Sequence, residues 1–285
     1  FNHRNFVFDA ISSVITQVKF FDEIIIIDDA SLDGTNDVVR EYLSSVNLSC
    51  KTTFFSKKIN KGFCNSINLS TKLASNDNLV CLAGDDYFLE NSIENIRNAI
   101  LNNTNYSIIF GSSIMVDSNK NFISKLDYKK SFVPDSLSEF CIKGSSDLSG
   151  HSQNCWNKKL FSKFGPLSYK VTNEDDQLIF RSRIMGNIIT ISEPTRAYRI
   201  SQNGMSYDLV NYDVSFSTYK AKLKYQLDNR VNNHLLQISI LIRFYFDQNK
   251  SINVSSLVSS LSSNIACLRL FIKLMQISNI FQRTN

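Results

Sequence analysis

Four consecutive isoleucines, Ile24-Ile25-Ile26-Ile27, follow Glu23 and precede the acidic pair Asp28-Asp29. A run of β-branched residues without alternation is typical of a strand that is buried on both faces, as in a parallel sheet covered by helices. The segment Ser31-Leu32-Asp33-Gly34-Thr35, which comes next, has the composition of a turn. We therefore predict a buried parallel strand over residues 23–29, with two carboxylates at its end.

The same organisation continues over the first 110 residues. A second acidic pair, Asp85-Asp86, follows a strand expected at residues 78–82. Further strands are expected at 54–55 and 106–110, and helices at 5–17, 37–43, 64–75 and 90–101. This alternation predicts an α/β fold with an open, mostly parallel sheet and flanking helices. Ligands bind at the carboxyl edge of such sheets, which is where both acidic pairs are expected.

The length and composition fit a soluble globular protein with one large domain, or with one domain and an appendage. The chain has 285 residues, of which 43% are hydrophobic and 20% charged, and no apolar run approaches the length of a membrane span. Its six cysteines form no C-x-x-C pair. This usage predicts reduced thiols in a cytoplasmic protein, and neither a disulfide framework nor a zinc site.

Positive charge is concentrated toward the C-terminus. Residues 218–285 contain nine Lys or Arg and two Asp or Glu, a net charge of +7, and the preceding residues carry a net charge of −2. We predict a basic, amphipathic helical region over 206–285, distinct from a domain over 1–205. Because its basic residues are spread among apolar ones, we expect packing against the domain or contact with an anionic membrane surface, and no nucleic-acid partner.

A third acidic cluster, Asn173-Glu174-Asp175-Asp176, stands at the start of a helix expected over 177–185. The helix dipole favours acids there, so a structural role stays open beside that of a general base in a cleft. Two acidic pairs at one sheet edge repel each other unless cations or hydrogen-bond donors offset the charge. Their oxygens suit Mg²⁺ or Mn²⁺, and no P-loop or dinucleotide-binding pattern occurs that could hold phosphate instead. None of the three histidines has metal-ligand spacing to another.

Five motifs in this order resemble glycosyltransferase family 2. They are Phe1-Asn2-His3 with Asp28-Asp29-Ala30-Ser31-Leu32-Asp33-Gly34-Thr35, then Asn60-Lys61-Gly62 with Asn65 and Asn68, then Leu82-Ala83-Gly84-Asp85-Asp86, then Glu174-Asp175 with Leu178, Arg181 and Gly186, and last Tyr198-Arg199-Ile200-Ser201. The resemblance implies a GT-A fold. It also implies inverting transfer of a sugar from a nucleotide-diphosphate sugar, most often a UDP-sugar, to a hydroxyl of a glycan or lipid-linked acceptor. Bacterial surface polysaccharide assembly, such as that of O-antigen or capsule, is the setting it suggests.

The resemblance implies roles for individual residues. Asp29 would bind the uracil, Asp86 would hold the Mn²⁺ or Mg²⁺ that bridges the diphosphate, and Asp175 would deprotonate the acceptor hydroxyl. The remaining nucleotide-sugar-binding residues would be Phe1, Lys61, Asp85, Glu174 and Arg199.

The sequence departs from the family pattern at three points. Ala83 stands where many members have the first Asp of the metal motif, Ser201 stands where a His is common, and the strand expected before Phe1 is missing. Ala83 and Ser201 keep an alternative open, which is a catalytically weak or inactive sugar-nucleotide-binding or scaffold protein on the same fold. A receiver-like phosphoacceptor domain is disfavoured by the chain length and by the pair Glu174-Asp175. We expect a cytoplasmic protein, attached to the inner face of the plasma membrane if residues 206–285 bind lipid.

Overall fold

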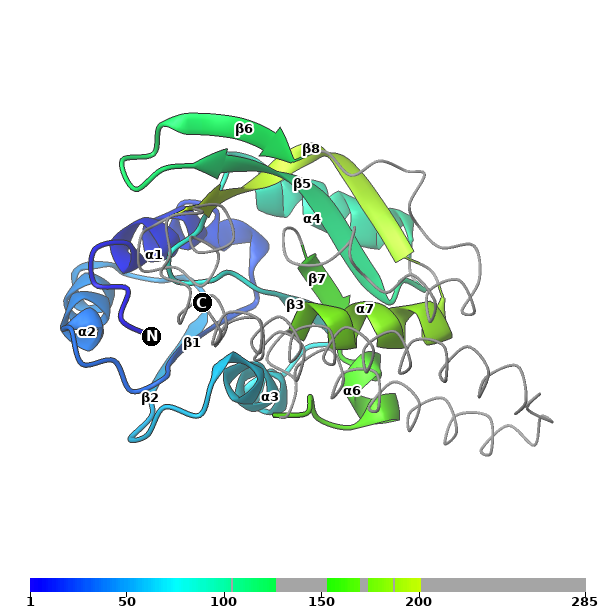
Figure 1. Ribbon diagram of the computed structural model, residues 1–285, viewed down its shortest axis with the longest axis horizontal. Coiled ribbons are helices and arrows are strands. Elements are labelled where there is room, and N and C mark those ends of the chain that lie inside the picture. Colours follow the sequence, from blue (N-terminus) through cyan, green and yellow to red (C-terminus); the bar gives the residue numbers. More distant parts are fainter. Residues whose placement is uncertain (104, 127–152, 170–173, 187, 201–285) are drawn as a thin grey trace, which may run out of the picture. The chain divides into compact units, whose positions relative to one another are not determined.

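The isoleucine run forms strand β1, Glu23–Asp28, in the computed structural model of the chain (Figure 1). It pairs in parallel with β2, Lys51–Ser56, and the register places Asp28 opposite Ser56. Helix α2, Thr35–Ser45, connects the two strands. The structure describes residues 1–103, 105–126, 153–169, 174–186 and 188–200, all of which belong to one compact unit.

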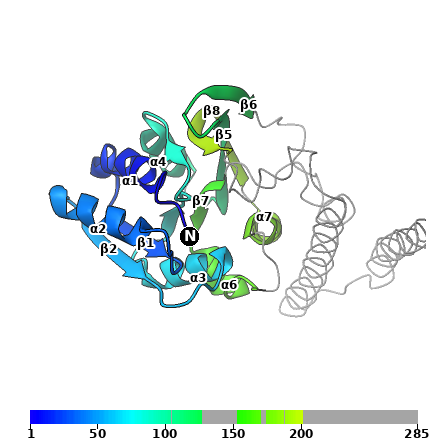
Figure 2. The same ribbon diagram turned by 60° about the vertical axis from the view of Figure 1, so that its left-hand side comes forward.

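Three helices surround this pair of strands. Helix α1, Val7–Ile15, packs against α2, and the two share an apolar core with β1 and β2 that includes Val7, Ile11 and Val39. Helix α3, Phe63–Leu73, contacts β1. Figures 1 and 2 both place α1 and α2 together beside the two strands, with α3 on their other side. Helices therefore lie on both sides of β1, as the lack of alternation predicted, but of the four isoleucines only Ile24 is buried and the other three are partly exposed.

A second, six-stranded sheet holds the remaining strands. They are β3 (Asn78–Val80), β4 (Tyr87–Phe88), β5 (Ile108–Val116), β6 (Phe122–Leu126), β7 (Gln153–Asn157) and β8 (Ile188–Arg199). Their order is β3-β7-β5-β8-β4, with β6 pairing with β5. Only β5 and β8 run parallel among these described strands.

Four more helical segments complete the described part. The 3-10 helix η1, Val18–Phe20, follows α1, and helix α4, Ser92–Asn102, packs on the second sheet through a core that includes Ile93, Ile96 and Ile109. Helix α6, Lys159–Phe164, contacts α7, Glu174–Met185. Helix α7 also contacts β5, so the acidic cluster of the sequence begins a helix that lies against the second sheet.

The α/β class with flanking helices is confirmed, but the expected mostly parallel sheet is mixed. Four of the six pairings among the described strands are antiparallel. Parallel strands require long crossovers, which helices supply between β1 and β2 and between β5 and β8. Strands β4 and β7 join the second sheet as short antiparallel members that the alternation of the sequence does not indicate. The expected helices of 206–285, and the boundary at 205 and 206, lie outside the described residues.

Candidate functional site

Asp29 lies directly after β1 and is held by a buried lysine. The Lys57 ammonium donates to Oδ1 of Asp29 at 3.0 Å, to Oδ1 of Asn65 at 2.8 Å and to Oγ of Ser66 at 2.8 Å. The side chains of Lys57 and Asp29 are only 7% and 9% exposed. The backbone N–H of Lys61 donates to the same Oδ1 at 2.9 Å. One oxygen of Asp29 therefore accepts two hydrogen bonds, and no donor to its Oδ2 occurs among the described residues.

Lys61 therefore contacts Asp29 through its backbone N–H. The residue itself is exposed, in the loop before α3. Lys57, by contrast, was not among the residues predicted for the site. The parallel register gives the signal that could have found it. Because Asp28 lies opposite Ser56, the residues that follow the two strands, Asp29 and Lys57, are neighbours.

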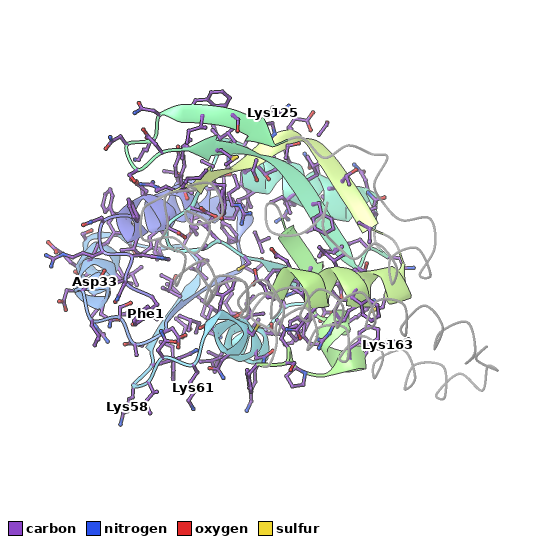
Figure 3. The ribbon with its side chains drawn as sticks, in the orientation of Figure 1. Phe1, Asp33, Lys58, Lys61, Lys125 and Lys163 are labelled. Carbon is purple, nitrogen blue, oxygen red and sulfur yellow. The ribbon has the colours of Figure 1, made fainter. Side chains whose placement is uncertain are left out.

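The N-terminal segment is attached to the turn that follows β1. The backbone N–H of Asn2 donates to Oγ of Ser31 at 2.8 Å, that of His3 to Oγ1 of Thr35 at 2.9 Å, and that of Arg4 to Oδ2 of Asp33 at 2.9 Å. These bonds fix Phe1, which is half exposed, beside the end of β1. Figure 3 labels Phe1, Asp33, Lys58 and Lys61 in the part of the molecule formed by α2, β1, β2 and their loops.

His3 brings this segment to the second acidic pair. Its Nε2 lies 3.7 Å from Oδ2 of Asp85, and the two side chains are 27% and 19% exposed. Burial lowers the pKa of His3 below its usual value, and the negative charge of Asp85 opposes that effect. Smaller opposing contributions to the same pKa come from Asp33 and Asp28. The imidazole therefore lies within electrostatic reach of both acidic pairs that the sequence placed at one edge.

Asp86 is buried and engaged, with 1% of its surface exposed. Its Oδ1 accepts a hydrogen bond from the backbone N–H of Arg199 at 3.0 Å, and its Oδ2 lies 3.6 Å from Nε of Arg196. Burial raises the pKa of Asp86 to about 7, although the positive charge of Arg196 lowers it and that of Asp85 raises it further. Its neighbour Asp85 is the more accessible of the two carboxylates.

Glu174 and Asp175 begin helix α7 as a hydrogen-bonded pair of carboxyl groups. Burial raises the pKa of Glu174 well above its usual value, and the charge of Asp175 and their hydrogen bond raise it further. The positive charge of Arg196 acts in the opposite direction. Two adjacent carboxyls in a low-dielectric site cannot both ionise easily, so ionisation of Glu174 is disfavoured beside Asp175.

Helix α7 is fixed at the loop before it by two of its own side chains. Arg181 donates through Nη1 to the carbonyl of Gly165 at 2.7 Å and through Nη2 to that of Pro166 at 2.8 Å. Gln177 accepts from the backbone N–H of Ser168 at 2.7 Å through Oε1. These bonds set the position of the first turn, and hence that of Asp175.

The second and third acidic clusters lie within electrostatic reach of the same two side chains, Cys81 and Arg196. Burial raises the pKa of the Cys81 thiol to about 12, and the negative charges of Glu174, Asp175 and Asp86 raise it as well. Arg196 partly offsets them at the same thiol. Carboxylates separated by about 90 residues therefore act on one thiol and one guanidinium. Arg196 and Cys81 were not predicted as site residues, since nothing in their local sequence marks them.

Arg199 has a different environment from the one expected for a phosphate-binding residue. Its guanidinium is 2% exposed and donates through Nη2 to Oδ2 of Asp9 at 2.8 Å, and it lies 4.5 Å from the ring centroid of Phe6. A contact with phosphate would require this buried ion pair to open. The geometry favours a structural role for this side chain, linking β8 to α1.

The residues present fit a divalent cation at Asp85 better than at Asp86. Within the described ranges, no three His, Cys, Asp or Glu side chains come close enough together to hold a metal ion by themselves. Mg²⁺ and Mn²⁺ sites in phosphate-binding enzymes often use only one or two protein ligands, with substrate phosphates and water as the others. Asp85 offers a partly exposed oxygen for such a site, whereas both oxygens of Asp86 face donors inside the protein. The metal role predicted for Asp86 stays untested, and its burial argues against it.

Among the helices that the structure describes, none combines the length and the apolar character required to cross a bilayer. The expected contact of residues 206–285 with a membrane surface lies outside the described residues.

Comparison with known proteins establishes the class. The sequence profile of glycosyl transferase family 2 matches residues 1–158, more than half of the chain. The chain belongs to this family. No curated protein sequence gives a significant match.

Solved structures of S. aureus TarS are similar in fold. TarS residues 1–349 in complex with UDP-GlcNAc match with a TM-score of 0.56 and 14% identity, over 86% of this chain and 70% of that one. The same TarS fragment in complex with UDP matches with a TM-score of 0.55 and 14% identity, over 80% of this chain and 67% of that one. At such identities the likeness concerns the fold, and it confirms the GT-A type predicted from the sequence.

Proposed function

We propose that this chain is an inverting glycosyltransferase that moves a sugar from a UDP-sugar to a hydroxyl group of a glycan or lipid-linked acceptor. The observation that carries the proposal is that Arg196, 3.6 Å from Asp86, is also within electrostatic reach of Glu174, so that the second and third acidic clusters share one cationic neighbour. The family provides the reaction class, and UDP and UDP-GlcNAc bound to the TarS structures support a uridine nucleotide as the donor.

Uracil recognition is assigned to Asp29. Its Oδ1 is occupied by Lys57 and by the backbone N–H of Lys61, which leaves Oδ2 to accept a hydrogen bond from the N3–H of uracil. Phe1, half exposed beside the end of β1, offers an aromatic face to the base. The diphosphate then extends toward Asp85, where a bound Mn²⁺ or Mg²⁺ would neutralise its charge as it departs.

Asp175 is assigned the role of general base. The acceptor oxygen forms a bond to the anomeric carbon while the bond from that carbon to the diphosphate oxygen breaks, and the hydroxyl proton passes to Asp175. Attack opposite the leaving group inverts the anomeric configuration. Glu174, whose pKa is raised by burial and by Asp175, would retain a proton, donate it in a hydrogen bond to Asp175 and keep that carboxylate in place. Positioning both reactants in line supplies much of the rate acceleration.

The decisive experiment compares Asp175→Asn with the full chain and with Asp22→Asn, which changes an exposed carboxylate before β1. UDP-sugar binding is measured by calorimetry, and turnover by UDP release with water or a glycan as acceptor. We expect Asp175→Asn to retain binding and to lose turnover by a factor of about 10² to 10⁴. Unchanged turnover in Asp175→Asn would remove this residue from the base role.

The alternative of an inactive sugar-nucleotide-binding or scaffold protein rests on Ala83, which brings no carboxylate to the loop that carries Asp85, and on Ser201, which stands where the family often has a His. It predicts UDP-sugar binding without turnover in the full chain itself. The change in melting temperature caused by each of a panel of nucleotide sugars, with and without Mn²⁺, shows which donor the protein binds and whether binding requires the metal. Absence of a shift with every nucleotide would overturn the proposed donor class.

We also propose a cellular location for this reaction. A lipid-linked acceptor in surface polysaccharide assembly would place the enzyme at the inner face of the plasma membrane, and the net charge of +7 over residues 218–285 suits an anionic surface. Flotation with anionic liposomes, comparing the full chain with residues 1–206, tests this attachment. Equal flotation of the two proteins would exclude it.

A further inference from the structure

The imidazole of His3 is held at a defined place beside the Asp85 loop. The backbone N–H of His3 donates to Oγ1 of Thr35, and its carbonyl accepts from the N–H groups of Phe6 and Val7 at the start of α1. These bonds tie the residue to the frame formed by α1 and α2. The backbone of His3, from which the ring extends toward Asp85, is therefore fixed by the first turns of α1 and α2.

Gly84 allows this close approach. A Cβ atom added at this position would lie 2.8 Å from Nδ1 of His3, a distance that real side chains do not tolerate. The backbone of Gly84 thus forms one wall against the ring, while Nε2 faces Oδ2 of Asp85 at 3.7 Å. That separation exceeds a hydrogen bond, so the nitrogen and the oxygen face each other without a proton shared between them.

The spacing suits two ligands of one cation. Ligand atoms about 2.1 Å from a metal are separated by about 3.0 Å when they are at right angles and by about 4.2 Å when they are opposite. The distance of 3.7 Å between Nε2 and Oδ2 exceeds the right-angle value by less than 1 Å, so a small rotation of either side chain brings both atoms within reach of one cation. Both groups are partly exposed, as a site shared with a substrate phosphate requires. The adjacent Ala83 supplies no side-chain donor.

The chemistry of the side chain also suits metal binding. Imidazole is the commonest metal ligand among protein side chains, and it binds through one ring nitrogen. We infer that His3 binds, through Nε2 and together with Asp85, the divalent cation that holds the diphosphate of the donor. This inference rests on the proposed function.

A mixed nitrogen and oxygen site has a consequence for the choice of metal. Imidazole suits first-row transition metals, whereas Mg²⁺ prefers ligands that are all oxygen. His3 should therefore make Mn²⁺ more effective than Mg²⁺ in increasing the affinity for UDP. Removal of the imidazole should reduce the increase in UDP affinity that Mn²⁺ causes. The smaller increase caused by Mg²⁺ should change less.

The experiment is calorimetric titration of UDP into the full chain with Mn²⁺, with Mg²⁺ and with EDTA. Variants are His3→Ala, Gly84→Ala and the matched controls His151→Ala and His234→Ala, which remove the two other histidines. We expect Mn²⁺ to increase UDP affinity in the full chain and both controls, and His3→Ala and Gly84→Ala to lose about tenfold or more of that gain. An equal Mn²⁺ effect in His3→Ala overturns the inference.

A second measurement needs no variant that disturbs folding. Electron spin echo modulation of the Mn²⁺–UDP complex detects a directly bound imidazole nitrogen, and labelling of histidine with ¹⁵N changes the modulation frequency. Nitrogen modulation that responds to the label, and that persists in His151→Ala and His234→Ala, supports His3. Its absence in the full chain overturns the inference while UDP binding, and with it the proposed function, stands. If UDP does not bind under any condition, the proposed function fails first.

Discussion

The guanidinium of Arg199 donates through Nη2 to Oδ2 of Asp9 at 2.8 Å, which joins the end of β8 to α1 across 190 residues of sequence. Its Nη1 also donates to the carbonyl of Ser118 at 3.3 Å, in the turn between β5 and β6. The backbone N–H of the same residue donates to Asp86. One residue thus connects α1, a hairpin turn and the buried carboxylate of the second acidic pair.

This connection predicts a loss of stability, and not of nucleotide binding, when Arg199 is changed. Arg199→Gln leaves a partly buried Asp9 with Lys120 as its remaining partner, which should lower the free energy of unfolding by about 3 kcal/mol. The backbone donor to Asp86 is retained. Urea unfolding measures the loss, with the exposed Arg97→Gln as a control expected to stay within about 0.5 kcal/mol. An unchanged midpoint combined with weakened UDP binding would restore Arg199 as a phosphate ligand.

Because Asp86 is buried, we expect the stability of the protein to fall as pH rises. Burial raises its pKa from 3.8 to about 7, so the folded protein binds this proton more tightly than the unfolded chain. The free energy of unfolding should therefore fall as pH rises from about 4 to 7 and level off above that range. Asp86→Asn keeps an acceptor for the N–H of Arg199 and removes the titration.

The measurement is urea unfolding of both proteins at pH 5 and pH 8. Relative to the unchanged chain, Asp86→Asn should gain up to about 3 kcal/mol between the two pH values. Contributions from Glu174 and His3 are common to both proteins and largely cancel in the difference. A difference that is constant with pH means that Arg196 holds Asp86 ionised in the folded state.

The sequence alone predicted those features of the fold that depend on neighbouring residues in the chain. The isoleucine run predicted β1, because consecutive β-branched residues suit a strand that is covered on both faces, and α1 and α3 are found around it. The acidic pair after the run and the turn at Asp33 and Gly34 followed from the composition of the segment. Gly34 has a φ of +89°, a conformation that favours glycine.

The remaining features depend on distances along the chain that no local pattern encodes. His3 and Asp85 are 82 positions apart, and His3 had no spacing to another ligand that could mark it. The two-residue strand β4 and the strand β7, which contains Cys155 and Trp156, are defined by antiparallel partners found far away in sequence. For the same reason the expected strand 78–82 ends earlier, at Val80, where its pairing with β7 stops.

The carboxyl pair Glu174–Asp175 at the start of α7 leads us to expect a small loss of turnover in Glu174→Gln and a large one in Asp175→Asn. If Glu174 holds a proton and donates to Asp175, then Glu174→Gln replaces an O–H donor by an N–H donor of similar shape. Turnover of UDP-sugar should stay within about tenfold of the unchanged chain, whereas Asp175→Asn loses about 10² to 10⁴. Initial rates of UDP release measure both. Equal losses in the two variants would show that Glu174 acts as an ionised group.

Lys57 predicts a change in nucleotide selectivity. Its ammonium donates hydrogen bonds to Asp29, Asn65 and Ser66 and holds the Asp29 carboxylate, a group that can only accept hydrogen bonds, at the end of β1. Such a group pairs with the N3–H of uracil but not with N3 of cytosine, which is itself an acceptor. Lys57→Met should weaken UDP binding by about tenfold or more and bring it closer to that of CDP, because Asp29 then loses the partner that fixes its position.

Lys58→Met is the matched control, since Lys58 is the next residue and is exposed. Calorimetric titrations with UDP and CDP give the ratio of the two affinities in each protein, and urea unfolding gives the stability. A merely structural role for Lys57 would lower the stability and weaken UDP and CDP equally, with the ratio unchanged. A ratio that falls in Lys57→Met but not in Lys58→Met assigns base selectivity to the buried pair, since only the identity of the base differs between the two ligands.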